Sequence, residues 1–359
     1  MIINQVKSVL LLSHEMSMTG APVALQYMAK QLKEDGIFVV VLSPKYGPMV
    51  EEMLEDDILV IVDGTIGGNS EWIKWASNFD LIVVCTVVPY HNIEQLEQTN
   101  IPVVWWIHDG EMSFQLGANK LLPYKLCNNI HVYAGGGYAC RIVKKYRPSY
   151  MIQELLYCVP DYAQTLSSEW KYEIVNPNNK LIISSIGSID RRKAQDVLVK
   201  AIRSMSPDLI KQCLFLFIGK NNDDAVYQHI VKLKEDYPQN VQTIVQVSRE
   251  EIADIYRQSA VVVCTSRDDP MPVFMTESLM LGIPVICSDH TGTYDLLKDG
   301  VNGLTFKSEN INDLKDKIEF AIENREQMYR IGQCGRKVYE DNFTKEAFRK
   351  ALYEMIEKI

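Results

Sequence analysis

Short apolar runs alternate along the chain with segments of helical spacing. Residues 9–12 and 37–42 are continuous runs of large aliphatic side chains, typical of buried strands, and residues 24–32 between them have the apolar spacing of an amphipathic helix. A strand, a helix and a strand in this order form a βαβ unit, whose crossover makes the two strands parallel. The beginning of the chain therefore predicts a parallel sheet covered by helices.

The same alternation continues through the rest of the chain. The strands expected at residues 58–61, 81–84 and 103–107 are continuous apolar runs, which is typical of a strand covered on both faces. The expected strands are residues 58–61, 81–84, 103–107, 130–133, 181–186, 214–218, 241–247, 261–264 and 285–287. From Asn310 onward the spacing is helical. The fold class is therefore α/β with parallel sheets.

Composition limits the function classes. The chain has 359 residues, of which 47% are hydrophobic, and is long enough for two domains with separate cores. A net charge of -9 disfavours a nucleic-acid-binding protein, because neutralising phosphates requires a basic face. The 8 cysteines are spread singly, which indicates a reducing, cytoplasmic compartment. No apolar run reaches the length of a membrane span, so we expect a soluble chain.

A turn between a strand and a helix carries the first candidate chemistry. The turn holds Asp269, and Pro272 suits the first position of a helix, because proline lacks the N–H that is unpaired there and its φ is already helical. The N–H groups of Val273 and Phe274 have no partner inside such a helix and lie at the positive end of its dipole. The sequence therefore predicts an anion site with a carboxylate beside it.

A second carboxylate, Glu277, follows one helical turn later. Gly282 and Pro284 end this helix before the next strand. A carboxylate so close to an anion site is unsuited to binding the anion, but it can accept hydrogen bonds from hydroxyl groups, as an acidic residue accepts them from a ribose in other nucleotide folds. A solvated acid on an ordinary turn is the alternative interpretation.

Two positions in the first half of the chain follow the ends of predicted strands. Gly20, in the loop after the first strand, lets the backbone approach a ligand. His108 directly follows the strand at 103–107, at the carboxyl edge where parallel sheets bind ligands, and Asp109 and Glu111 after it are weaker candidates. A structural histidine and a plain helix-start turn are the alternative interpretations.

The helix expected at residues 138–146 is basic in an otherwise acidic chain. It carries Arg141, Lys144 and Lys145, and Arg147 follows it. Two interpretations stay open: a weak peripheral contact with anionic lipid or an acidic acceptor, and an ordinary solvated face. Under the first, the protein works in the cytoplasm at the inner membrane face.

The segment DDPMPVFMTESLMLGIPVI resembles the Glu-x7-Glu signature of the retaining glycosyltransferases of family 4, with Asp269 in the first acidic position and Glu277 in the second. The resemblance implies the GT-B fold, in which two Rossmann-like domains with parallel sheets face an interdomain cleft. It also implies a nucleoside-diphosphate sugar as co-substrate, with a UDP-sugar favoured, and neither a bound metal nor another cofactor.

The resemblance implies a role for each candidate residue of these loops. Asp269 would contact the donor sugar and Glu277 the ribose. The amides of Val273 and Phe274 would bind the diphosphate. His108 matches a family histidine that contacts hydroxyl groups of the donor sugar.

The loop after the strand at 181–186 resembles the family's Gly-Arg-x4-Lys-Gly segment, whose Arg and Lys hold the diphosphate. Lys193 matches the Lys, while Ser188 replaces the Arg. A cation belongs here because breaking a sugar–phosphate bond leaves growing negative charge on the diphosphate. Arg192 or Arg191 would compensate for Ser188, and the spacing does not choose between them.

Three further positions follow from the resemblance. Gly20 matches one glycine of the family's N-terminal glycine loop and is carried over as a diphosphate-binding residue. Gly219 stands where the family has a glycine turn lining the nucleotide pocket, and the main chain near Val247 would contact the base.

The resemblance also predicts the domain organisation. Residues 1–160 would form the acceptor-side domain and residues 161–343 the nucleotide-sugar donor domain. Residues 344–359 would form a helix that returns to the first domain.

The resemblance implies transfer of a sugar, with retention at the anomeric carbon, to an acceptor hydroxyl. The acceptor would be a carbohydrate, glycolipid or glycoprotein. The reaction would serve the synthesis of cell-surface polysaccharide, glycolipid or glycoprotein. Ser188 and Asp269 depart from the family's pattern and keep two alternatives open. One is a non-catalytic nucleotide-sugar-binding partner of another glycosyltransferase. The other is a GT-B sugar-nucleotide epimerase.

Overall fold

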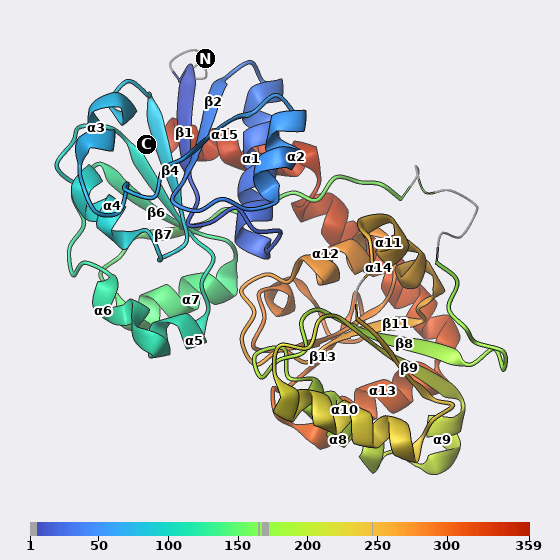
Figure 1. Cartoon of the computed structure of the whole chain (residues 1–359). Helices are drawn as coiled ribbons and strands as arrows, with labels where there is room; N and C mark the ends of the chain where they lie inside the picture. The colour runs from blue at the N-terminus through green and yellow to red at the C-terminus, as the bar shows by residue number, and fades with distance from the viewer. Residues whose placement is uncertain (1–5, 164–165, 167–171, 246) are drawn as a thin grey trace. The chain divides into compact units, whose positions relative to one another are not determined.

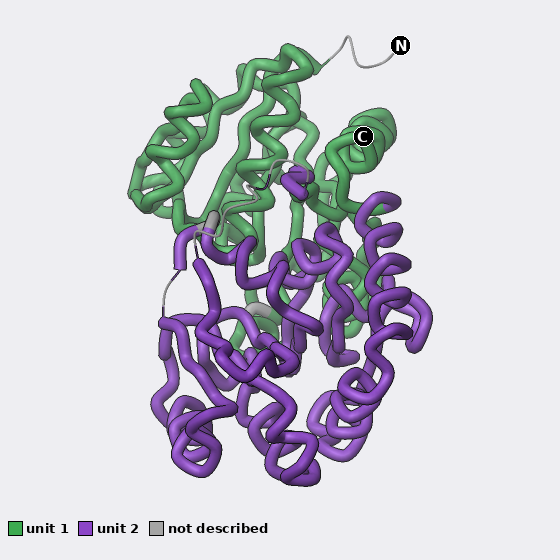
Figure 2. The backbone as a smooth tube through the Cα atoms, turned by 90° about the vertical axis from the view of Figure 1, so that its right-hand side faces the viewer, with its two compact units in different colours: residues 1–159, 342–359 green, residues 160–341 purple. Residues whose placement is uncertain are grey.

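The computed structural model describes residues 6–163, 166, 172–245 and 247–359. Figure 1 shows the helices and strands, and Figure 2 shows the two compact units. Unit 1 comprises Met1–Val159 and Asn342–Ile359, and unit 2 comprises Pro160–Asp341. Each unit is an α/β domain with its own sheet.

Unit 1 contains a 7-stranded parallel sheet in the order β3-β2-β1-β4-β5-β6-β7. Its strands are β1 (Ser8–Leu12), β2 (Phe38–Ser43), β3 (Leu59–Val62), β4 (Leu81–Cys85), β5 (Val103–Ile107), β6 (Ile130–Ala134) and β7 (Ile152–Glu154). Helices cover both faces of this sheet (Figure 1). Central strands are therefore apolar on both sides, and Leu10, Val83 and Trp105 are completely buried.

The last helix of the chain belongs to unit 1. The helices of this unit are α1 (Gly20–Glu34), α2 (Met49–Glu55), α3 (Glu71–Ala76), α4 (Tyr90–Leu96), α5 (Glu111–Ser113), the π-helix η2 (Phe114–Ala118), α6 (Asn119–Leu121), α7 (Gly137–Tyr146) and α15 (Lys345–Lys358). Phe348 of α15 stacks on Trp106 of β5 with ring centroids 6.4 Å apart. Lys345 Nζ lies 2.6 Å from Oε1 of Glu34 in α1.

Unit 2 contains a 6-stranded parallel sheet in the order β10-β9-β8-β11-β12-β13. Its strands are β8 (Leu181–Ile186), β9 (Cys213–Ile218), β10 (Val241–Ile244), β11 (Val261–Cys264), β12 (Val285–Ser288) and β13 (Leu304–Phe306). Its helices are α8 (Gln195–Ser204), α9 (Pro207–Lys211), α10 (Asp224–Asp236), α11 (Arg249–Gln258), α12 (Val273–Met280), the 3-10 helix η3 (Thr293–Leu296), α13 (Ile311–Glu323) and α14 (Arg325–Asn342).

The strand order reverses once in each sheet, between β1 and β4 in unit 1 and between β8 and β11 in unit 2. Loops that leave the carboxyl ends of the two strands at such a point run to opposite faces of the sheet. The space between them is where open α/β sheets bind ligands. This topology brings the loops after β8 and β11 together.

The predicted strands are confirmed, three of them with the expected ends (β5, β8 and β11), but one strand is shorter than expected and two were not predicted. The strand expected at 241–247 ends at Ile244, and the sequence analysis did not predict the 3-residue strands β7 and β13. Among the described residues, no helix combines the length and apolar character needed to cross a membrane.

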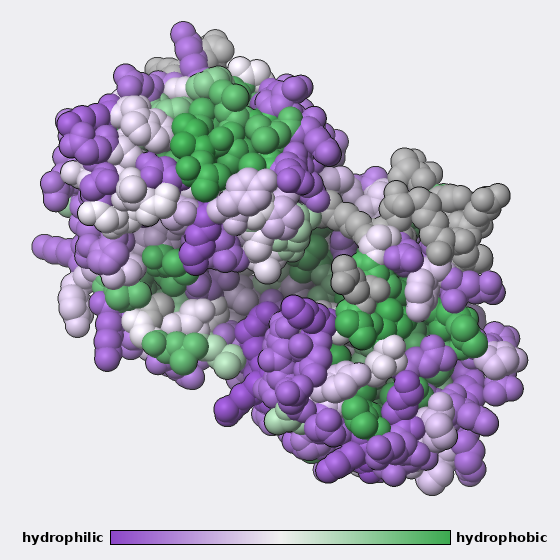
Figure 3. All heavy atoms as spheres, in the orientation of Figure 1, coloured by the Kyte–Doolittle hydropathy of each residue, from purple (hydrophilic) through white to green (hydrophobic). Residues whose placement is uncertain are grey.

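The apolar run at 58–61 was expected to be covered on both faces, and this was wrong. It forms β3, an edge strand of unit 1, where Leu59 is 53%, Ile61 41% and Val62 42% exposed. An edge strand pairs on one side only, so the neighbouring helices do not enclose it. Figure 3 shows a broad apolar area on unit 1 over the region where Figure 1 labels β1 and β2.

The loop between β1 and α1 is held by a close backbone approach at Gly47. A Cβ at this position would lie 2.2 Å from the carbonyl oxygen of Met16, and the N–H of Met49 donates to the same oxygen at 3.0 Å. The Met16 side chain is buried. Only glycine permits this contact, which fixes the loop that leads to Gly20.

We predict that Gly47→Ala lowers the free energy of unfolding by about 1–3 kcal/mol, the usual cost of an overpacked contact. Gly67→Ala is the control, because a Cβ there meets nothing within 4 Å, and its effect is expected to stay below about 0.5 kcal/mol. Urea unfolding followed by tryptophan fluorescence measures both variants. Equal midpoints for the two would contradict the role given to Gly47.

Candidate functional site

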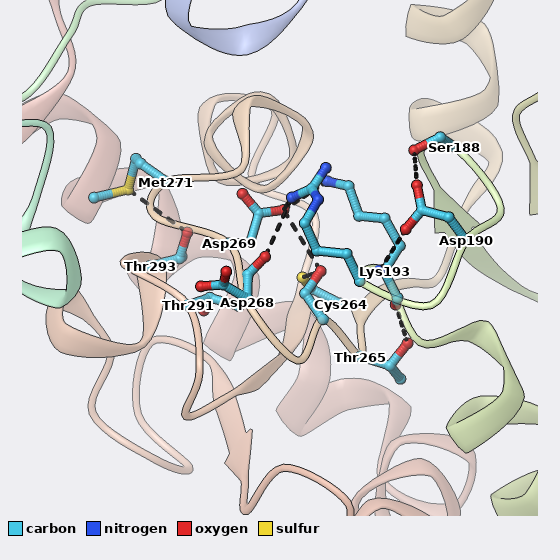
Figure 4. Close-up of polar contacts among 12 residues, drawn as sticks. Ser188, Asp190, Lys193, Cys264, Thr265, Asp268, Asp269, Met271, Thr291 and Thr293 are labelled. Atoms are coloured by element: carbon cyan, nitrogen blue, oxygen red, sulfur yellow. Dashed lines mark hydrogen bonds and ion pairs between the residues drawn. The ribbon is translucent and has the colours of Figure 1, made fainter. Parts of the chain in front are cut away.

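Two loops of unit 2 meet at the carboxyl ends of β8 and β11. The N–H of Arg267 donates to the carbonyl oxygen of Arg192 at 2.8 Å. The Thr265 hydroxyl donates to the carbonyl oxygen of Lys193 at 3.0 Å (Figure 4). These hydrogen bonds tie the loops together, so the side chains that they carry are fixed relative to one another.

A compact cluster of charges forms where these loops meet. Nζ of Lys193 lies 2.6 Å from Oδ2 of Asp269 (Figure 4), and Nη1 of Arg192 lies 3.5 Å from the same oxygen. The side chains of Asp269 and Lys193 are 8% and 13% exposed, while that of Arg192 is 40% exposed. Two cations therefore face one carboxylate oxygen.

The position of Lys193 depends on two neighbours. Gly187 has a φ of 127°, and a Cβ on it would lie 3.4 Å from Cε of Lys193. The Lys193 ammonium lies 5.1 Å from the centre of the Phe274 ring, within the range of a cation–π interaction. The lysine chain is therefore guided between a glycine and an aromatic ring toward Asp269.

Helix α12 begins beside this cluster at Val273. The expected start at Pro272 was wrong by one residue, because Pro272 is the N-cap, with an extended ψ of 117°. The first helical hydrogen bond is donated by Met275 to the carbonyl oxygen of Pro272 at 3.1 Å. The N–H groups of Val273 and Phe274 precede that bond, and a proline side chain cannot cap them. The positive end of α12 is thus open to an acceptor.

Main-chain contacts hold Asp269 in place. Its N–H donates to the carbonyl oxygen of His290 at 3.1 Å, and its own carbonyl oxygen accepts from the N–H of Gly292 at 3.0 Å. A Cβ on Gly292 would lie 1.7 Å from the carbonyl oxygen of Pro270, so this turn requires glycine. The turn after β12 therefore fixes the first acid of the signature, a contact that the sequence analysis did not foresee.

The second acid, Glu277, is half-buried on α12 and accepts a hydrogen bond from Oη of Tyr256 at 2.7 Å. Tyr256 lies on α11 and is completely buried. It holds Oε2 of Glu277 in a fixed place. The sequence analysis missed Tyr256, because on an amphipathic helix it does not differ from an ordinary core residue.

Ser188 supports the loop after β8 from within. Its hydroxyl donates to Oδ2 of Asp190 at 2.6 Å, and Oδ1 of Asp190 accepts the N–H of Lys193 at 2.9 Å. Of the two arginines considered as its replacement, Arg192 approaches the cluster, whereas Arg191 lines a separate hollow on unit 2. The geometry favours Arg192.

The two base-binding candidates lie at the same sheet edge. Gly219, with a φ of 146°, packs so closely on the turn after β8 that a Cβ would lie 2.0 Å from the carbonyl oxygen of Gly187. Its N–H donates to the carbonyl oxygen of Ile244 at 2.8 Å. Val247 is half-buried against a small apolar cluster beyond β10. Their contact with a base stays a prediction.

In unit 1, His108 follows β5 directly. Its ring centroid lies 4.2 Å from that of Trp106, and a Cβ on Gly135 would lie 2.5 Å from its Nδ1. Burial, and to a lesser extent the nearby His14, lower the pKa of His108 to about 3. The imidazole is therefore neutral at physiological pH. Its Nε2 is buried and has no hydrogen-bond partner among the described residues.

The weaker candidates of unit 1 have structural contacts. Oδ2 of Asp109 accepts from the N–H of Val87 at 2.8 Å, and Oε1 of Glu111 accepts from Oη of Tyr146 at 2.7 Å. Gly20 is the first residue of α1, and an added Cβ would meet nothing within 4 Å. Its role toward a diphosphate stays a prediction.

The basic residues at α7 do not form one solvated face. Arg147 is 8% exposed and donates to main-chain carbonyl oxygens, including that of Leu122 at 2.5 Å. Lys145 lies 2.8 Å from Oε1 of Glu111. The expectation that four cations face solvent or lipid together was therefore wrong for Arg147, because its guanidinium holds a loop instead.

The cluster in unit 2 combines two kinds of recognition. Two cations and an open helix N-terminus suit an anionic group, and two fixed carboxylates suit hydroxyl groups. A molecule that carries both kinds of group within a few ångströms would satisfy all of them.

Two family models match the chain, one on each unit. Residues 167–338 match the family described as glycosyl transferases group 1, and residues 5–125 match that described as glycosyl-transferase family 4. Spore coat protein SA of Bacillus subtilis (strain 168) is 25% identical over 191 residues, which are 50% of this chain and 50% of that protein. The chain thus spans about half the length of this curated relative.

Solved structures share the fold over almost the whole chain. The crystal structure of Anabaena Alr3699/HepE in complex with UDP and glucose has a TM-score of 0.80 at 15% identity, covering 99% of this chain and 100% of that one. A glycosyltransferase from Rickettsia africae ESF-5 has a TM-score of 0.78 at 18% identity, covering 98% of each chain. These likenesses confirm the expected GT-B fold. With this fold and a family model on each unit, the chain belongs to the family 4 type of glycosyltransferases.

Proposed function

We propose that this protein transfers a sugar from a nucleoside-diphosphate sugar to a hydroxyl group of an acceptor, with retention at the anomeric carbon. The observation that carries the proposal is the pairing of Lys193 with Asp269, to which Arg192 and the open N-terminus of α12 add positive character. Such a cluster stabilises an anion next to hydrogen-bond acceptors. Retention is taken from the family.

In the proposed reaction the bond between the anomeric carbon and the diphosphate oxygen breaks. The acceptor oxygen bonds to the same face of that carbon, and the departing phosphate takes the acceptor's proton. Lys193, Arg192 and the N–H groups at the start of α12 stabilise the negative charge that grows on the diphosphate. Because these groups are held in place beforehand, they need little reorganisation. Side chains thus supply the charge compensation, and the proposal includes no metal or other cofactor.

The two acids bind the donor's hydroxyl groups in this proposal. Asp269 accepts from the sugar, while Glu277, which Tyr256 holds in place, accepts from the ribose. Gly219 and Val247 flank the base. The neutral imidazole of His108 suits a hydroxyl of the donor sugar better than its phosphates.

We propose a UDP-sugar as donor, since HepE, which has the same fold, was crystallised with UDP and glucose. The acceptor is a carbohydrate, glycolipid or glycoprotein. We propose a cytoplasmic location, because all the cysteines of the chain are free thiols, as expected in a reducing compartment.

A second candidate is a non-catalytic nucleotide-sugar-binding protein. Ser188 favours it, because this residue bonds to Asp190 and brings no charge to the cluster. Release of nucleoside diphosphate separates the candidates: the second predicts donor binding without release, whatever the acceptor. An epimerase would instead convert the donor without an acceptor.

Donor binding is predicted to raise the thermal stability of the protein. At a concentration of 100 times Kd, a ligand that binds only the folded state stabilises it by about 2.7 kcal/mol. We expect UDP-sugars to raise the apparent Tm more than GDP-, ADP- or dTDP-sugars in a thermal-shift panel. If none of these donors changes the Tm, the proposed donor class is wrong.

Lys193→Ala is predicted to lower kcat by about 10²–10³-fold, the usual effect of removing one fixed donor from a developing anion. Steady-state measurement of nucleoside diphosphate release tests this. Lys211→Ala is the matched control, because this lysine lies on α9 with a side chain that is 70% exposed. Equal rates for the two variants would remove Lys193 from the mechanism.

A further inference from the structure

A groove crosses unit 1 at the amino ends of β6 and β7, opposite the carboxyl edge where parallel sheets bind their ligands. One hollow, of about 510 Å³, is lined by the loop before β6 and the turn before β7. A second, of about 650 Å³, shares Cys127, Asn128 and His131 with the first. The second hollow is also lined by Glu97, whereas the described lining of the first holds no carboxylate side chain, so the name amino-edge groove is used here for the first hollow alone.

A buried arginine fixes one wall of the amino-edge groove. Arg147 donates to the carbonyl oxygens of Leu122 and Pro123 at distances between 2.5 and 3.2 Å. Its guanidinium carbon lies 4.6 Å from the centre of the Tyr124 ring, and the Tyr150 hydroxyl also donates to Pro123. Burying a guanidinium is costly unless carbonyl oxygens satisfy its donors. This loop therefore keeps one shape, and the ring that it presents, Tyr124, is 85% exposed.

The amino-edge groove combines apolar surface with polar and cationic groups. Tyr124 is joined by Met151, which is 90% exposed. Lys125, Gln153 and Lys358 contribute ammonium and amide groups. Among the described residues that line the first hollow there are two lysines and no carboxylate side chain, in a chain with a net charge of -9. The groove is thus locally cationic in an acidic protein.

These surfaces define the chemistry of a ligand. An exposed tyrosine ring offers a flat face to C–H groups, amides bond hydroxyl groups, and lysines attract negative charge. An acidic oligosaccharide has all three features. Single-stranded nucleic acid also stacks on aromatic rings beside lysines, so the choice between the two ligands comes from the proposed function and is tested below.

We propose that the amino-edge groove binds a segment of an acidic oligosaccharide, separately from the site of transfer. One sugar ring stacks on Tyr124, and an acidic group lies near Lys125 or Lys358. The choice of a glycan rests on the proposed function, because an enzyme that extends a glycan raises the local concentration of acceptor ends by holding the chain elsewhere. The groove itself does not depend on that function.

Two thiols provide an internal test. Cys127 is exposed and lines both hollows, whereas Cys334 is exposed on α14 of unit 2. The full chain is screened against an array of uronate-bearing, phosphate-bearing and neutral oligosaccharides, and maleimide labelling of each thiol is followed by mass spectrometry. At a concentration of ten times Kd, a bound acidic oligosaccharide is expected to slow labelling of Cys127 about tenfold and to leave Cys334 unchanged.

Variants assign the binding to the groove. Tyr124→Ala is expected to weaken binding about tenfold, whereas Tyr329→Ala, a change at a tyrosine that is 66% exposed on α14, leaves it unchanged. Lys125→Ala, which keeps the aromatic wall intact, weakens binding of acidic oligosaccharides and spares neutral ones. Lys193→Ala keeps full binding at the groove even where transfer is lost, so failure of the proposed function and failure of the groove are distinguishable.

The proposal is overturned if no oligosaccharide of the array protects Cys127, or if protection extends equally to Cys334. It is also overturned if neutral oligosaccharides bind as tightly as acidic ones, or if a single-stranded RNA protects Cys127 and oligosaccharides do not. Thermal melts establish that each variant is folded. If Tyr124→Ala unfolds, the labelling of Cys127 in the unaltered chain still tests whether the groove binds an acidic oligosaccharide.

Discussion

The ion pair between Lys193 and Asp269 is the contact on which the candidate site of unit 2 depends. It joins two loops that are 76 residues apart in the sequence and buries both side chains. Removing one partner of a buried pair is usually destabilising, but loss of Lys193 leaves Arg192, 3.5 Å from the same oxygen, to balance Asp269. Two cations therefore share one carboxylate oxygen. An anion at the start of α12 would offer both cations a further acceptor.

The fold explains why these residues meet. In a parallel sheet every strand points the same way, so all loops that follow strands leave from one edge, and the two central loops flank the point where the strand order reverses. In unit 2 those strands are β8 and β11. The glycines at 219 and 292 then bring the backbones together more closely than any side chain would permit. The strand order and these glycines therefore both bring the loops of the candidate site close together.

The sequence predicted what repeats along the chain better than what meets across it. Buried central strands appear as apolar runs, and the turn that holds Asp269 and the helix that holds Glu277 follow one of them. Lys193 was predicted through the resemblance of its loop to a family segment. Edge strands break this rule: β3 is apolar yet exposed, and β7 and β13 are too short to leave a periodic signal. Contacts between segments that are distant in the sequence left no periodic signal either. Tyr256 resembles a core residue, and Arg147 resembles a surface cation although it is buried beneath a loop.

The geometry of the ion pair allows a nucleotide-sugar donor to bind while the ion pair stays intact. A lysine ammonium has three hydrogens and a guanidinium has five, so each can bond a phosphate oxygen while keeping its contact with Asp269. Among the described residues, the side-chain contacts of Asp269 use Oδ2, which leaves Oδ1 for a hydroxyl group. Aspartate has one methylene fewer than the glutamate of the family signature, and the Asp269 backbone is held by hydrogen bonds to the turn after β12. A short side chain on a fixed backbone has few rotamers to lose on binding. The substitution therefore preserves the charge and the acceptor while making their position more rigid.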